Sequence, residues 1–187
     1  MPSTIRLKHL SGMIPESELN LIRSSFGKLG IGFECIDISR EPQASLEKLV
    51  SPIILYLSSD IVQTYILGLV TSVSYDIIKA NIVRIWRHMS GKMITETTPS
   101  GVRSIEADFD LDIKTTGQVS VKFKLKGDIP DNLKEKCIDK AFQLLEAKAF
   151  PENRTGYVCI YDVNQDEWEF FELLEFVRKF VKLKDDH

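Results

Sequence analysis

The stretch that decides the fold runs from residue 46 to residue 89 and reads LEKLVSPIILYLSSDIVQTYILGLVTSVSYDIIKANIVRIWRHM. No other part of the chain is as long and as apolar. We expect a helical hairpin over 44–89, with a shorter helix over 44–57 that Pro52 kinks and a long helix over 61–89. The break falls at residues 58–60, where Asp60 is a good N-cap for the second helix.

The first half of the predicted long helix is apolar on nearly every side, which is typical of a helix that is buried in a protein core or lies in lipid. The longest runs without a charged side chain are 49–59 and 61–75. Both are shorter than the roughly 18–20 residues that span a bilayer. A buried core hairpin is therefore the favoured interpretation. Membrane insertion and an exposed interface of a homo-oligomer stay open as alternatives.

The chain before the hairpin predicts a strand, a helix and a second strand. Residues 4–10 alternate apolar and polar side chains, which is typical of a half-buried strand. An apolar stripe with spacings of three and four predicts a helix over 15–29, and Gly30 is placed to end it. The second strand is expected over 33–38. Because a helical crossover usually returns the chain in the same direction, the two strands should be parallel.

The chain after the hairpin has the clearest strand pattern, a strand hairpin over 103–126. Apolar side chains alternate with acidic ones up to Ile113, and after a turn at 115–117 they alternate with lysines from Val119 onward. If Ile113 faces Val119, a ladder of opposite charges crosses the outer face of the hairpin. The predicted pairs are Asp110 with Lys122, Asp108 with Lys124, and Glu106 with Lys126.

The predicted fold class is α+β: a small mixed or antiparallel sheet covered by helices, including the long apolar helical hairpin. A helix after Asp128, a strand over 157–163 and a helix from about Leu173 complete the expected elements, and residues 167–172 fit either a strand or a helix. We divide the chain into an α+β core over 1–149 and a C-terminal strand-plus-helix appendage over 150–187 that packs on the core.

The composition is that of an ordinary globular protein, with 187 residues, 43% hydrophobic and 27% charged side chains, and a formal net charge of −3. Neither half of the chain carries the excess of basic residues typical of nucleic-acid binders, so nucleic acid is not an expected partner. The N-terminus lacks the hydrophobic region of a signal peptide, which favours a cytoplasmic location. Cys35, Cys137 and Cys159 lack the CxxC spacing of zinc or redox sites, and we predict no metal and no cofactor.

A cluster of cationic side chains surrounds Trp86 near the end of the predicted long helix. Its members are Lys79, Arg84, Arg87 and Lys92, with His88 among them. Such a cluster would suit contact with an anionic surface, either lipid or nucleic acid. Cations in the last turn of a helix also complement the helix dipole, so a solvated helix end is the simpler interpretation.

Three carboxylates share one face of the predicted strand hairpin. Asp108, Asp110 and Asp112 alternate along one strand, where successive side chains on a face lie about 6.6–6.8 Å apart. Clustered carboxylates can hold Mg²⁺ for a hydrolase or nuclease. The ladder of lysines on the facing strand accounts for the same side chains without a metal and is the favoured interpretation.

The histidines and cysteines give no catalytic prediction. His9 with Cys35 or Cys159 would provide a base and a thiol nucleophile, but no local sequence supports that pairing. His187 stands at the end of the chain, where residues are usually frayed. We therefore predict no catalytic residue.

The order of elements resembles that of the effector-associated constant component family. The resemblance lies in strand, helix, strand, apolar helical hairpin, strand hairpin and helix, with LVSPIILYLSSDIVQTYILGLV (49–70) followed by IEADFDLDIKTTGQVSVKFKLKG (105–127). Members of that family are small proteins encoded in bacterial conflict systems beside NTPases and variable effectors. The resemblance covers residues 1–149 and implies a non-enzymatic adaptor, with no catalytic residues to transfer. Residues 150–187 lie outside the pattern.

The sequence leads to three hypotheses about function. The first is a non-catalytic interaction or adaptor protein with a protein partner, in a bacterial defence or conflict system. The second is a membrane-associating effector that acts through the apolar hairpin. The third is a metal-dependent hydrolase or nuclease that uses the aspartate cluster.

Overall fold

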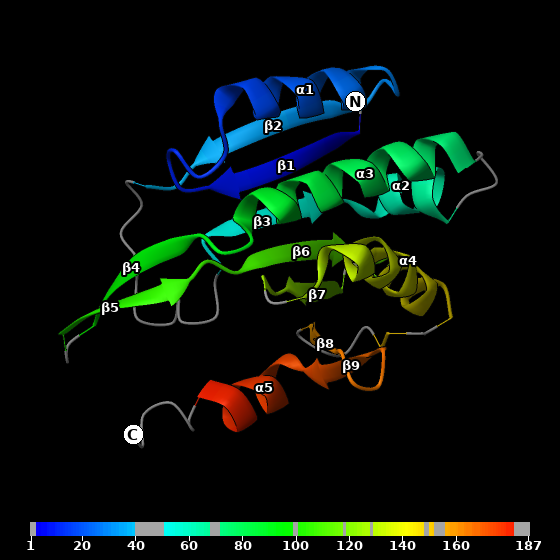
Figure 1. Ribbon diagram of the computed structural model, residues 1–187. Helices are drawn as coiled ribbons and strands as arrows, with labels where there is room; N and C mark the ends of the chain where they lie inside the picture. The colour runs from blue at the N-terminus through cyan, green and yellow to red at the C-terminus, as the bar shows by residue number, and fades with distance from the viewer. Residues whose placement is uncertain are drawn as a thin grey trace.

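The protein is built on a mixed sheet of seven strands in the order β2-β1-β3-β6-β7-β8-β9 (Figure 1). The computed structural model describes residues 3–39, 51–67, 72–98, 101–117, 119–127, 129–147, 150–151 and 156–181. The strands of this sheet are β1 (Thr4–His9), β2 (Gly32–Asp37), β3 (Ile53–Leu57), β6 (Phe109–Lys114), β7 (Ser120–Leu125), β8 (Tyr157–Asp162) and β9 (Glu167–Glu172). A separate ribbon of β4 (Met93–Thr98) and β5 (Gly101–Glu106) projects beyond the sheet.

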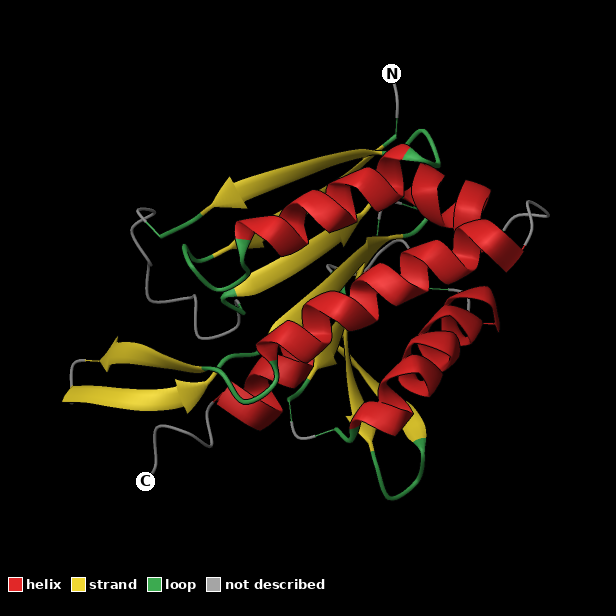
Figure 2. Cartoon of the chain, turned by 45° about the horizontal axis from the view of Figure 1, so that its top comes forward, coloured by secondary structure: helices red, strands yellow, loops and turns green. Residues whose placement is uncertain are grey.

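Three long helices cover one face of the sheet side by side, with α3 in the middle (Figure 2). They are α1 (Glu16–Gly27), α3 (Ser72–Met89) and α4 (Asp131–Ala147). The shorter helical segments are α2 (Ser59–Ile61) and α5 (Leu173–Phe176), and the π-helical turns η2 (Val62–Ile66) and η3 (Val177–Val181). Because Val158 and Phe171 point away from α4 and contact Phe176, α5 packs on the opposite face of the sheet.

The main core lies between the sheet and the three long helices. Strand β1 buries Ile5 and Leu7 on this side, and the middle helix α3 buries one stripe against the same strands. The side chains of that stripe are Ile78, Ile82, Ile85, Trp86 and Met89. Their spacing of three and four residues is that of one helix face, so the sequence pattern fixes which side of α3 faces the sheet.

The predicted helical hairpin over 44–89 is wrong, and with it the predicted fold class. Residues 53–57 form β3, which pairs with β1 on one side and β6 on the other in the middle of the sheet. Within the described residues no long apolar helix or helical hairpin is present, and the sheet is larger than expected. Residues 44–50, where the first helix was expected to begin, lie outside the described part of the chain.

The error has a physical cause. A strand buried on both faces gives a continuous apolar run, and periodicity alone cannot distinguish such a run from a buried helix. Ile53, Leu55 and Leu57 face the helices and Ile54 faces the other side, and all four are buried. Pro52, which we interpreted as a helix kink, stands directly before the first strand residue, a position that proline tolerates well.

The predicted long helix over 61–89 is also wrong, because it is divided. Ser58 caps α2 through its hydroxyl, which accepts the Ile61 N–H at 3.5 Å, and the π-helical turn η2 follows. The separate helix α3 begins at Ser72, beyond the undescribed residues 68–71. Among the described residues, no helix is long and apolar enough to cross a membrane.

The predicted strand hairpin over 103–126 is correct in its faces and wrong in its register. Strand β5 pairs with β4, and only β6 pairs with β7. The observed partner of Ile113 is Val121, and Asp110 and Asp112 pair with Lys124 and Lys122. A shift by two residues leaves every side chain on its expected face, because side chains alternate with a period of two.

The first and last parts of the chain agree with the predicted elements. Strands β1 and β2 pair in parallel, and α1 connects them along the chain. Gly30 follows that helix with a positive φ of 70°. In residues 150–187, β8 pairs in parallel with β7, β9 returns antiparallel to β8, and α5 begins at Leu173. The C-terminal segment therefore extends the main sheet by two strands.

Candidate functional site

A surface groove lies over the outer side of the helical layer. Its residues come from α1, α3 and α4, and it has a volume of about 730 Å³. The inner side of α3 is held by the core, so its outer side is presented between the two flanking helices. We call this feature the helical-face groove.

The floor of the helical-face groove is an apolar strip on α3. Val73, Ile77 and Ala80 follow one another at spacings of four and three residues and therefore lie along one side of the helix, opposite the buried stripe. Val73 has 61% of its surface exposed, Ala80 is exposed and Ile77 is half-buried. Exposed side chains of this kind at helical spacing are typical of a surface that binds another helix.

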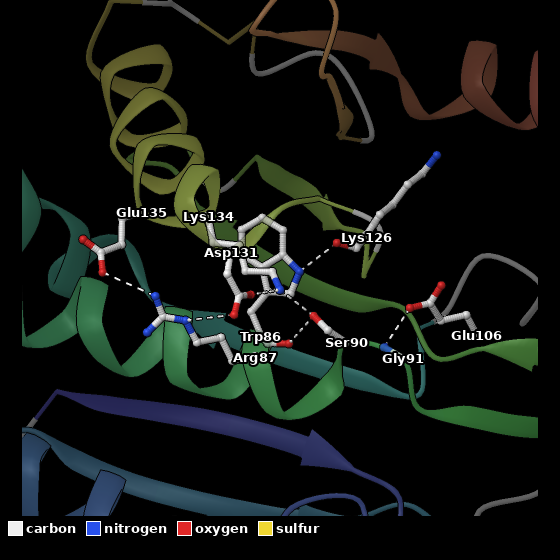
Figure 3. A network of polar contacts seen from close by, with 9 residues as sticks. All are labelled: Trp86, Arg87, Ser90, Gly91, Glu106, Lys126, Asp131, Lys134 and Glu135. Carbon is white, nitrogen blue, oxygen red and sulfur yellow. Dashed lines mark hydrogen bonds and ion pairs between the residues drawn. The ribbon is translucent and has the colours of Figure 1, made fainter.

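Ion pairs border the helical-face groove at the C-terminal end of α3. On the α1 side, Glu18 lies 3.7 Å from the Arg84 guanidinium and 3.3 Å from the His88 ring. On the α4 side, the Arg87 guanidinium lies 3.9 Å from Asp131 and 3.7 Å from Glu135 (Figure 3). The arginine pairs are longer than hydrogen bonds and about half exposed, so each stabilises the fold by at most about 1 kcal/mol.

One charge in the helical-face groove has no counter-ion among the described residues. Asp76 is exposed on α3, directly before Ile77 and one turn before Ala80, and no described cation forms an ion pair with it. Its carboxylate therefore faces solvent beside the apolar strip. The combination of an apolar floor with one unpaired anion is the distinctive chemistry of this site.

Polar contacts fix the walls of the helical-face groove relative to its floor. The Asn81 amide donates to the Ser25 hydroxyl of α1 at 3.0 Å. On the other side, the Lys79 ammonium donates to Asp139 of α4 at 3.0 Å, and the Tyr75 hydroxyl donates to the same carboxylate. Burial and this carboxylate hold the pKa of Tyr75 well above its usual value, so the hydroxyl remains a donor. These contacts within the chain fix the positions of α1 and α4 on either side of α3.

A second network anchors the end of α3 to the rest of the protein (Figure 3). The indole N–H of Trp86 donates to the carbonyl of Lys126 at 2.9 Å. Lys134 of α4 is 2% exposed, lies 5.5 Å from the centre of the Trp86 ring, and donates to Ser90 at 2.7 Å and to Asp131 at 2.5 Å. The pairing with Lys134 holds the pKa of Asp131 below its usual value. The network joins α3 and α4 to the residue that follows β7, and it holds the buried ammonium in place.

The same region also anchors the projecting ribbon. The Gly91 N–H donates to the Glu106 carboxylate at 2.9 Å, and the Ala107 N–H donates to the Lys92 carbonyl at 2.7 Å. The Glu106 carboxylate occupies the space that a Cβ on Gly127 would need, since Oε1 would then lie 1.9 Å from that atom. A glycine at 127 therefore lets the ribbon approach the end of β7.

The structure separates the five residues predicted to contact an anionic surface. Arg84 and Arg87 lie in the helical-face groove, each beside acidic side chains. Lys79 is paired with Asp139 of α4. Trp86 is fully buried against the sheet, and Lys92 donates to the backbone carbonyl of Met13. These side chains do not present one continuous cationic surface.

The aspartates of the alternative metal-binding interpretation have other partners. Asp110 is fully buried, with its two oxygens 3.2 Å from the Lys124 ammonium and 3.6 Å from that of Lys122. Its Oδ2 accepts no hydrogen bond from a described residue. Asp112 accepts from the Ser120 hydroxyl at 2.6 Å, and burial raises its pKa. Among the described residues, no group of three or more histidine, cysteine or acidic side chains is arranged to hold a metal ion.

The described cysteines and His9 have separate surroundings. Cys137 and Cys159 are fully buried, and burial raises the pKa of Cys137 to about 11. The pKa of the partly buried Cys35 is also raised by burial, so its reactive thiolate is disfavoured. The ring of His9 is within hydrogen-bond distance of the Leu10 carbonyl. His187 lies outside the described residues.

Reasoning from sequence did not identify the helical-face groove. The signal was present, because α3 is apolar at Val73 and Ile77 as well as along its buried stripe. We interpreted Val73 as part of the half of the long helix that is apolar on nearly every side, and we assigned no role to Ile77. Recognising an outward strip required the position of α3 between α1 and α4, which the local sequence does not contain.

Comparisons with known proteins give no family for this chain. No family model, no curated protein and no solved structure matches it. The geometry of the helical-face groove is therefore the main guide to the function of the protein.

Proposed function

We propose that the protein is a non-catalytic interaction protein that binds a protein partner in the helical-face groove. The observation that supports this most is the apolar strip of Val73, Ile77 and Ala80 on α3, which is flanked by α1 and α4. Exposed apolar surface with a charged rim is typical of a protein interaction site. The hydrogen bonds from α3 to α1 and α4 reduce the ordering cost of binding, because they fix the walls of the groove relative to its floor.

We further propose an adaptor role in the cytoplasm of a bacterial cell, as part of a defence or conflict system. This part rests on the resemblance of residues 1–149 to the effector-associated constant component family. An adaptor needs a preformed docking site and no catalytic centre, which agrees with a groove whose ionisable side chains are engaged in ion pairs apart from Asp76.

The two other hypotheses have lost the features that motivated them. The membrane-associating effector required an apolar helical hairpin, and residues 53–57 of that hairpin are the central strand β3. The metal-dependent hydrolase required three neighbouring carboxylates free to bind a metal, whereas Asp110 and Asp112 are engaged by lysines and a serine. Neither is proposed further.

A capture experiment with matched variants tests the proposed function. The full chain is immobilised as wild type, as Ala80→Gln, which fills the floor of the groove, and as Arg23→Glu, which reverses a charge on the side of α1 that faces β2. We expect a partner from a lysate of the cells that encode the protein to be retained by wild type and Arg23→Glu and lost from Ala80→Gln. Equal retention by all three proteins would contradict binding in the groove. Light scattering of the purified variants would show whether that partner is a second copy of the chain.

A further inference from the structure

We propose that the helical-face groove receives one amphipathic helix of a partner protein, with a lysine or arginine of that helix beside Asp76. The inference rests on the proposed function, because it specifies the kind of segment that the same groove would bind. Three features of the groove lead to it: its length, its lack of free backbone groups and its charge.

The length of the helical-face groove suits a helix of about four turns. It follows α3 from Val73 to Arg87. At 1.5 Å per residue this stretch is about 21 Å long, which matches about 14 residues of a helix lying along it. The apolar strip occupies the first half, so the partner helix needs apolar side chains at spacings of three and four over about two turns.

The walls and floor of the groove favour a helix over an extended peptide. All three sides are helices, whose backbone N–H and C=O groups are bonded within each helix beyond its terminal turns. An extended peptide gains much of its affinity from pairing its backbone with the free edge of a sheet, and the groove offers no such edge. A helix satisfies its own backbone groups, so it can enter the groove without leaving buried polar atoms unpaired.

The charges of the groove determine where the partner helix needs a cation. Glu18 already lies beside Arg84, and Glu135 beside Arg87, so the two arginines are neutralised in place. Asp76 remains as the carboxylate without a described cation, at the apolar end. A basic side chain beside Asp76 completes the pairing, and the net charge of −3 of the whole chain favours the approach of such a partner.

A peptide selection tests this directly. A yeast-displayed library of helical peptides of about 15 residues is selected against the full-length wild-type protein, and the affinities of the enriched peptides are then measured. We expect peptides with apolar residues at spacings of three and four and a lysine or arginine at one end. Ala80→Gln and Asp76→Lys should each weaken binding by about tenfold or more, corresponding to about 1.4 kcal/mol. Arg23→Glu, on the side of α1 that faces β2, should leave it unchanged.

A charge swap makes the test of Asp76 specific. Replacing the basic residue of an enriched peptide with glutamate should abolish binding to wild type and restore it to Asp76→Lys. Peptides that need Ala80 but ignore Asp76→Lys would overturn the inference and leave the proposed function standing. Peptides that ignore Ala80→Gln would contradict both. A selection that enriches no peptide would overturn the helical partner, while the capture experiment would still decide the proposed function.

Discussion

Replacing Asp110 with asparagine removes a buried negative charge that faces two lysines on β7. The Asp110 side chain is fully buried, and the ammonium groups of Lys124 and Lys122 lie 3.2 and 3.6 Å from its oxygens. At these distances and an effective dielectric constant of about 20, each attraction amounts to about 5 kcal/mol before the cost of desolvation. Asparagine keeps the size of the side chain and loses both attractions.

The expected net loss is smaller than the sum of these attractions. Removing one partner of a buried ion pair typically costs about 3–5 kcal/mol. The lysine side chains keep 20% and 11% of their surface exposed and can turn toward solvent. We therefore expect Asp110→Asn to lower the free energy of unfolding by about 3 kcal/mol, near the lower end of that range.

Urea denaturation at pH 7, followed by tryptophan fluorescence, measures this loss. The matched control is Glu34→Gln, which breaks an exposed ion pair between Arg6 and Glu34 at 2.8 Å on the same face of the sheet. Because that pair is mostly solvated, the control should lose at most about 1 kcal/mol. A loss for Asp110→Asn no larger than that of Glu34→Gln would refute the assignment of Asp110 as a buried counter-ion. Stabilisation of the wild type by added Mg²⁺ would also contradict it.

Three further expectations concern other parts of the protein. Lys134→Ala should lower the free energy of unfolding by about 2–3 kcal/mol in urea denaturation, because it leaves a cavity beside Trp86 and removes two hydrogen bonds. Lys134→Met keeps the side-chain volume and should lower it by less than about 1.5 kcal/mol. Equal losses for the two variants would contradict the packing role of Lys134. Lys136, Lys140 and Tyr161 hold the pKa of Asp166 well below its usual value, so the ionised carboxylate stabilises the fold above about pH 4, and this contribution is lost as the pH falls further. Asp166→Asn should therefore lower the Tm at pH 7. A difference in Tm between wild type and variant that is as large near pH 2 as at pH 7 would be inconsistent with this. In native protein an aromatic disulfide reagent should react with Cys35 before the two buried cysteines, and equally fast modification of Cys137 would contradict its burial and its pKa of about 11.

Local patterns were sufficient to predict those elements that show a partly polar face. The alternation in β1 and the spacing in α1 each define one buried side, so both elements and their parallel pairing with β2 followed from the sequence. The alternating faces of β6 and β7 followed for the same reason. Their register did not, because the length of the turn between Lys114 and Ser120 sets it.

The middle of the chain could not be predicted from local patterns. Residues 53–57 are buried on both faces of the sheet, and a segment with no polar face carries no periodic signal. The groove was missed for a related reason. Whether Val73 and Ile77 are core or surface depends on where α1 and α4 pack, and those helices are distant in the sequence.

Methyl-group NMR with an enriched peptide tests the account most directly. Val73 and Ile77 report on the floor of the helical-face groove, while Ile54 and Val158 report on the opposite face of the sheet. We predict that titration shifts the methyl signals of Val73 and Ile77 and leaves those of Ile54 and Val158 in place. Shifts confined to Ile54 and Val158, with no change in the groove, would contradict the claim that this protein binds its partner on the outer face of α3.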